Sequence, residues 1–103
     1  MILARWKIDA RFGHKREVLD SVRWWADEIA TKIGWERDNM QIMTGSIGAS
    51  ESCVVTEVRL DSISALDESW NKLRELEEHA KWSQDLEPNI VSGTHRWEIY
   101  RLM

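Results

Sequence analysis

Hydrophobic and polar side chains alternate along the first residues of the chain. Every second position from Ile2 to Ala10 is apolar, and the positions between them include Arg5, Lys7 and Asp9. Because successive side chains of a strand point to opposite faces, this pattern predicts a half-buried β-strand over residues 2–10.

The period of the pattern changes after Gly13 and becomes helical from His14 to Ile33. At about 100° per residue, one side of such a helix is a continuous apolar stripe. The stripe consists of Val18, Val22, Trp25, Ile29 and Ile33. Gly34 is a natural C-terminal stop, so the pattern predicts a single helix over 14–33.

Three more strands and a second helical region follow. Alternating or β-branched segments predict strands over 39–47, 52–60 and 94–102. Asp61 or Ser62 is suited to cap a helix whose apolar stripe is Ile63, Leu66, Trp70 and Leu73. Glu77 falls on that apolar side, which predicts a break near 77–79 and a separate short helix over 80–86.

The predicted order is therefore β-α-β-β-α-β, in a single domain over residues 1–103. This is a ferredoxin-like α+β sandwich, in which two helices lie on one face of a four-stranded antiparallel sheet. The second face of the sheet is then solvated or covered by something else.

The side chains predicted for the second face are partly charged and partly apolar. The first strand contributes Arg5, Lys7 and Asp9, and the third contributes Cys53, Val55, Glu57 and Arg59. The last strand contributes either His95, Trp97, Ile99 and Arg101 or Arg96, Glu98, Tyr100 and Leu102. Such a mixture suits a face that packs on a second sheet around a polar-lined cavity, and we expect a homodimer.

Two segments of the sequence resemble a known superfamily. They are the strand "VVTEVRLDS", followed by an acidic helix with Trp70 and then His79, and the closing "HRWEIYRLM". With the element order and the chain length, they resemble the dimeric α+β barrel superfamily, and within it NIPSNAP-like and antibiotic-biosynthesis-monooxygenase-like domains. The resemblance covers nearly the whole chain and implies two sheets that meet face to face across a dimer.

The resemblance implies a range of activities, since the superfamily includes cofactor-free oxygenases, isomerases, haem-degrading enzymes and domains of unknown role. Haem-degrading members use an Asn on the first strand with a Trp and a His on the second helix. Trp70 and His79 match the last two, but the first strand contains no Asn.

Seven tryptophans in 103 residues are the most unusual feature of the composition. Their positions in the pattern assign Trp6, Trp25 and Trp70 to the core. Trp24, Trp35 and Trp82 fall on polar helix sides, which predicts exposed rings at a protein contact or a cavity mouth.

Charge and cysteine content exclude several classes of function. The 14 basic and 18 acidic residues give a net charge of −4, which argues against a nucleic-acid-binding module. Acidic residues concentrate in 61–89, where they form either a solvated helix face or a surface complementary to the basic residues of another subunit. Cys53 is alone, which excludes a disulfide framework and a CxxC metal site.

The chain shows no sign of a signal peptide or a membrane span, and we expect a cytoplasmic protein. His14, His79 and His95 have no metal-ligand spacing, so we expect neither a metal site nor a cofactor.

The candidate site lies on the second face of the sheet. Arg5, Lys7, Glu57, Arg59 and Trp97 are the candidate lining of a ligand cavity, in which Arg59 or Arg5 holds an acidic substrate. Glu57, His79 and His95 are the candidate catalytic groups, with Glu57 as a general base. The alternative is that these charges form cross-strand ion pairs at a dimer interface.

The sequence therefore predicts a domain that binds a small organic molecule in a barrel formed across a homodimer. One alternative is a cofactor-free monooxygenase or isomerase that acts on an aromatic or planar substrate. The other is a non-enzymatic dimerisation module whose barrel is filled by its own side chains.

Overall fold

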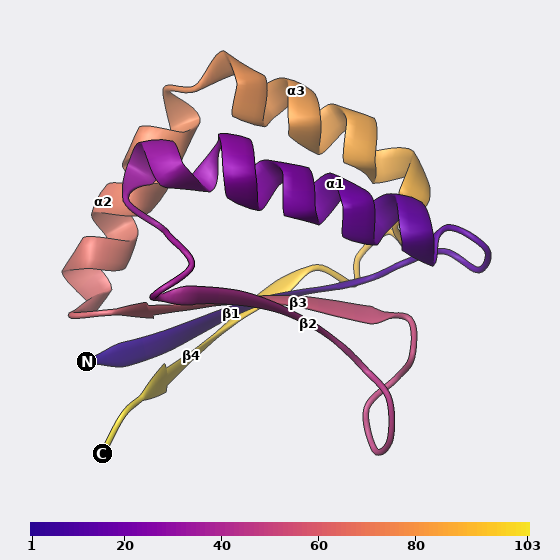
Figure 1. Cartoon of the computed structure of the whole chain (residues 1–103), viewed down its shortest axis with the longest axis horizontal. Coiled ribbons are helices and arrows are strands. Elements are labelled where there is room, and N and C mark those ends of the chain that lie inside the picture. Colours follow the sequence, from indigo (N-terminus) through magenta and orange to yellow (C-terminus); the bar gives the residue numbers. More distant parts are fainter.

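A four-stranded antiparallel sheet carries all the helices on one of its faces (Figure 1). The computed structural model describes residues 1–103. The elements are β1 (Ile2–Asp9), α1 (Lys15–Glu28), η1 (Ala30–Ile33), β2 (Met40–Thr44), β3 (Cys53–Leu60), α2 (Ile63–Arg74), α3 (Glu77–Leu86), η2 (Glu87–Asn89) and β4 (Arg96–Arg101). The sheet order β2-β3-β1-β4 is that of a ferredoxin-like sandwich, which confirms the predicted α+β architecture.

The first helical segment is shorter than its pattern predicted. The α-helix ends at Glu28, and the 3₁₀ turn η1 continues to Gly34, whose φ is 83°. Because the left-handed Gly34 reverses the chain, Trp35 turns back under the helices and is only 1% exposed. The prediction of an exposed Trp35 was wrong, because it continued the helical phase past this glycine.

The second helical region breaks earlier than expected. Leu76 has an extended backbone, with φ −91° and ψ 112°, and α3 begins at Glu77 instead of Ala80. The new helix starts with its own phase, which turns Trp82 inward to 8% exposure. The prediction of an exposed Trp82 was therefore also wrong. Ile63, which we expected in the apolar stripe of α2, is 54% exposed.

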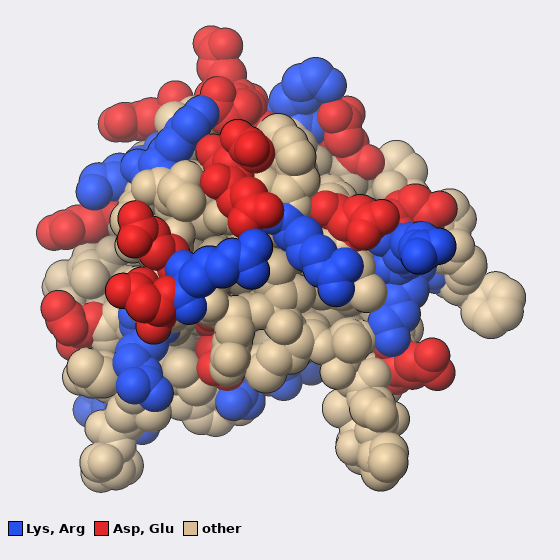
Figure 2. Space-filling view, viewed as in Figure 1, with Lys and Arg blue, Asp and Glu red and all other residues tan.

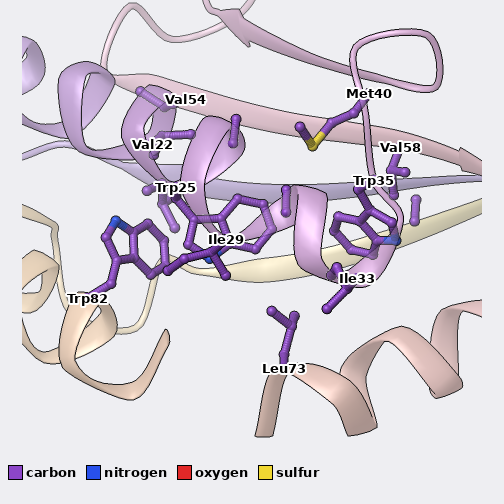
Figure 3. Packing of buried hydrophobic residues seen from close by; sticks show 14 of the residues in the cluster. Val22, Trp25, Ile29, Ile33, Trp35, Met40, Val54, Val58, Leu73 and Trp82 are labelled. Carbon is purple, nitrogen blue, oxygen red and sulfur yellow. The ribbon is translucent and has the colours of Figure 1, made fainter. Parts of the chain in front are cut away.

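The core lies between the helices and the sheet and buries three of the indoles, those of Trp25, Trp35 and Trp82 (Figure 3). Trp25 lies between two other rings, with centroid distances of 5.9 Å to Trp35 and 5.7 Å to Trp82. Trp6 and Trp70 are partly buried and pack against this cluster, which confirms their predicted core position. Trp24 is 49% exposed, as predicted.

The register of β4 decides which of its residues face the helices. Trp97 pairs with Trp6 across β1 and β4, and Glu98 pairs with Arg5. Trp97 therefore lies on the helix side, which decides between the two alternatives left open for this strand and removes Trp97 from the candidates of the second face. Arg96, Glu98 and Tyr100 lie on the second face instead, which we call the open face.

Opposite charges meet within the helical layer, where basic and acidic side chains interleave on the surface (Figure 2). Lys32 of η1 forms an ion pair with Glu78 of α3 at 2.7 Å. Part of the acidic character of 61–89 is thus matched by basic groups of the same chain. None of the helices has the length and hydropathy that a membrane span requires.

Candidate functional site

The charged residues of the open face form pairs across neighbouring strands. Nε of Arg5 donates to Oε2 of Glu57 at 2.7 Å, and Nε2 of Gln41 donates to Oε1 of Glu57 at 2.8 Å. Lys7 forms an ion pair with Glu98 at 2.8 Å. Both carboxylate oxygens of Glu57 are thus engaged, which leaves this residue poorly placed to act as a general base.

Two pKa values reflect this pairing. The hydrogen bond from Arg5 to Glu57 raises the pKa of the Arg5 guanidinium. The hydrogen bond from Lys7 lowers the pKa of the Glu98 carboxyl. Both shifts favour the charged form of the group concerned.

The remaining candidates lie in different places. Arg59 is exposed on the open face, where it lines a polar groove with Glu57 and forms no salt bridge. His95 is exposed before β4 and lines a groove with Trp6 and Ser83. His79 lies on α3, on the opposite side of the sheet from Glu57, so the structure does not bring the three candidate catalytic groups together.

A cavity of about 160 Å³ lies between the helices and the sheet, and we call it the indole cavity. Six of the seven tryptophans line it. Its lining residues are Trp6, Val22, Trp25, Trp35, Thr56, Trp70, Leu73, His79, Trp82, Ser83 and Trp97. Four of these eleven lining residues also line a surface groove beside Arg74, namely Trp70, Leu73, His79 and Trp97. The cavity therefore reaches the surface there.

His79 is held at the wall of this cavity as a neutral imidazole. Its Nδ1 accepts a hydrogen bond of 3.0 Å from Nε1 of Trp25, and its ring stacks on Trp82 with the centroids 5.7 Å apart. Since Nδ1 is the acceptor, the proton of the neutral ring is on Nε2. A second proton on Nδ1 would face the indole N–H, and burial also lowers the pKa of His79.

The other polar groups of the indole cavity are uncharged. Thr56 and Ser83 contribute hydroxyl groups, and no carboxylate, ammonium or guanidinium group lines it. Such a lining favours a ligand without a net charge, because an ion would enter without a partner.

The sequence pattern predicted a cavity on the other side of the sheet. His79 and Trp97 were candidates, but the cluster of indoles around them was missed. The feature of the sequence that pointed to this cluster was the unusual number of tryptophans, seven in 103 residues. Trp35 and Trp82 were assigned to the surface because the helical phase was continued across each break.

Haem is a poor fit to these residues. A porphyrin is far larger than a cavity of about 160 Å³. Nε2 of His79 also carries the ring proton as long as Trp25 donates to Nδ1, so neither ring nitrogen has a free lone pair for the haem iron. No group of three or more His, Cys, Asp or Glu side chains is arranged to hold a metal ion.

Comparison with solved structures shows which proteins share this fold. A NIPSNAP family protein from Agrobacterium tumefaciens matches with a TM-score of 0.81 and 22% identity, over 99% of this chain and 92% of that chain. An uncharacterised NIPSNAP-like domain protein from Burkholderia xenovorans matches with a TM-score of 0.82 and 15% identity, over 99% and 84%. A proposed antibiotic biosynthesis monooxygenase from Nitrosomonas europaea matches with a TM-score of 0.71 and 10% identity, over 100% and 99%.

The chain has the fold of NIPSNAP and antibiotic biosynthesis monooxygenase proteins. The resemblance stated from the sequence is thereby confirmed at the level of the fold, over the full length. No protein-family model matches the sequence, and no curated protein is significantly similar to it.

Proposed function

We propose that this protein binds a small, uncharged aromatic molecule in the indole cavity. The observation that carries the proposal is an apolar space of about 160 Å³ walled by six indoles and free of ionised groups. An apolar cavity of about 150 Å³ in another protein binds benzene, so a ligand with one aromatic ring fits a space of this size.

The arrangement of the indoles supports a flat ligand in particular. Neighbouring rings stand at steep angles, such as 67° between Trp25 and Trp35 and 65° between Trp70 and Trp97. A flat ring inserted among them finds both ring faces and ring edges, and both are favourable partners for an aromatic ring.

Toluene is a suitable probe for this proposal, with binding measured by isothermal titration calorimetry. Ser83 of α3 lines the cavity, so Ser83→Phe should fill part of the space and abolish binding. Gln84 is exposed on the same helix and does not line the cavity, so Gln84→Phe is the matched control and should bind normally. Absence of toluene binding to the wild type, or equal binding by both variants, would overturn the proposal.

A cofactor-free monooxygenase or isomerase that acts on such an aromatic molecule is the second candidate. His79 is the only lining residue with an acid–base side chain, and one similar structure is a proposed monooxygenase. The neutral His79 would donate from Nε2 to an oxygen of the substrate. An oxygen electrode with hydroquinone tests the oxygenase: uptake should depend on the protein and fall in His79→Gln, and an unchanged rate in that variant contradicts the role of His79.

We also infer that the open face packs against a second copy of the chain. Its paired charges, Arg5 with Glu57 and Lys7 with Glu98, lower the cost of covering these groups. The same pairing favours a dimerisation module with a filled barrel over a ligand site on this face.

A further inference from the structure

One buried hydrogen-bond donor of the molecule has no acceptor. Nε1 of Trp70 is buried and makes no hydrogen bond. The indole N–H groups of the other large buried rings are all paired. Trp25 donates to His79, Trp35 to Oγ of Ser69, and Trp82 to the carbonyl oxygen of Ser21.

An unpaired buried donor destabilises the folded state, since the N–H has lost water and gained nothing. Phenylalanine would supply an apolar ring at this position without that cost. Trp70 lies where the indole cavity meets the surface groove, and Trp97 packs against it edge to face at 5.4 Å. Trp70 thus belongs to the wall of the proposed ligand site, and its N–H is covered in the free protein.

We propose that Trp70 determines the specificity of the indole cavity. Its N–H donates to an acceptor atom of the aromatic ligand, such as a carbonyl oxygen, and so selects against hydrocarbons of the same shape. This inference rests on the proposed ligand binding and goes beyond it by naming a chemical group of the ligand.

Two further features of the site fit this role. Trp97 packs against Trp70 and is only half-buried on the edge strand β4, so a ligand would reach Nε1 of Trp70 by displacing this ring. His79 lines the same part of the cavity and carries its proton on Nε2. A carbonyl oxygen has two lone pairs and can accept from both donors.

The experiment compares two probes of nearly equal size and shape, acetophenone and α-methylstyrene, which differ in the carbonyl group. Indole N–H signals are recorded by ¹H–¹⁵N correlation NMR and assigned with Trp→Phe variants. We expect acetophenone to shift the Trp70 signal downfield and to bind roughly five- to tenfold more tightly than α-methylstyrene. The Trp70 signal should show no downfield shift with α-methylstyrene.

Trp70→Phe removes the donor and should bring the two affinities to within about twofold of each other. Trp97→Phe alters another ring of the same wall and should keep the preference for acetophenone. If both probes bind the wild type equally and the Trp70 signal is unmoved, the specificity role is wrong while ligand binding stands. If neither probe binds, the proposed function falls and this inference falls with it. The NMR result on the wild type decides the question even where Trp70→Phe does not fold.

Discussion

The tryptophans of this small domain serve as hydrogen-bond donors as well as apolar volume. Trp35 is the most deeply buried of them, and its Nε1 donates to Oγ of Ser69 on α2 at 3.1 Å. This bond ties the segment after η1 to α2. A polar contact thus fixes the position of a ring that burial alone would hold less specifically.

Removal of the acceptor, Oγ of Ser69, should show how much the hydrogen bond from Trp35 contributes to stability. Ser69→Ala leaves Nε1 of Trp35 buried and unpaired, so we expect the free energy of unfolding to fall by about 1–3 kcal/mol. Urea denaturation followed by circular dichroism measures the loss. Ser64→Ala, at an exposed position of the same helix, should change stability by less than about 0.5 kcal/mol. Equal effects of the two substitutions would show that the Trp35–Ser69 bond contributes nothing.

His79 should make the stability of the protein depend on pH. Because burial lowers its pKa in the folded state, the unfolded chain takes up a proton at a higher pH than the folded chain. The free energy of unfolding should therefore decrease as the pH falls through about 6.5, and level off once the folded His79 is itself protonated. Above that range His79 has no effect on the pH dependence.

Urea denaturation at pH 8 and pH 5.5 checks this in the wild type and in His79→Gln. Glutamine can still accept from Trp25 and does not titrate, so the variant should lose less stability between the two pH values. His14 and His95 are present in both proteins and cancel in the comparison. An identical loss in both would contradict the role given to His79.

At the level of elements, the strands and the first helical stripe were predictable because each rests on a long, regular pattern. A stop at Gly34 and a break in the second helical region were also predicted, but not the course of the chain after them, which depends on the left-handed Gly34 and the extended Leu76. The phase of β4 follows from its pairing with β1, which no local pattern contains. The first two points misplaced Trp35 and Trp82 and the third left the face of Trp97 open, and so the indole cavity could not be predicted.

The start of α2 was predicted correctly, and its cap can be tested. Oγ of Ser62 accepts a hydrogen bond of 3.1 Å from the backbone N–H of Ala65. Ser62→Ala should lower the free energy of unfolding by about 1 kcal/mol, whereas Ser62→Asp should keep most of the stability because aspartate also caps helices. Thermal and urea denaturation measure both variants. A stability of Ser62→Ala equal to that of the wild type would mean that the cap is dispensable here.

At the level of the whole molecule, the two faces of the sheet differ in the residues that they carry. The helix side holds the core and the indole cavity, and the open face carries the ion pairs with exposed apolar groups such as Tyr100. The shape of the single chain leaves this face uncovered (Figure 1). Binding of an aromatic ligand and pairing of two chains would therefore use opposite sides of one sheet and can be tested separately.

The oligomeric state follows from what covers the open face. Light scattering after size exclusion should give about 24 kDa, twice the 12.1 kDa of the chain, if two open faces pack together. Tyr100 is 46% exposed there, and Cζ of the Arg5 guanidinium lies over its ring, 5.1 Å from the ring centroid.

Tyr100→Glu replaces this aromatic surface by a second carboxylate beside Glu98, and should shift the protein toward the monomer. The matched control is Ile63→Glu, which puts the same charge on a residue that is 54% exposed on α2, away from the open face. This variant should keep the mass of the wild type. A wild-type mass of about 12 kDa, or an equal response of the two variants, would show that the open face is not the interface. Toluene binding to the Tyr100→Glu monomer would then establish that the indole cavity is complete within one chain.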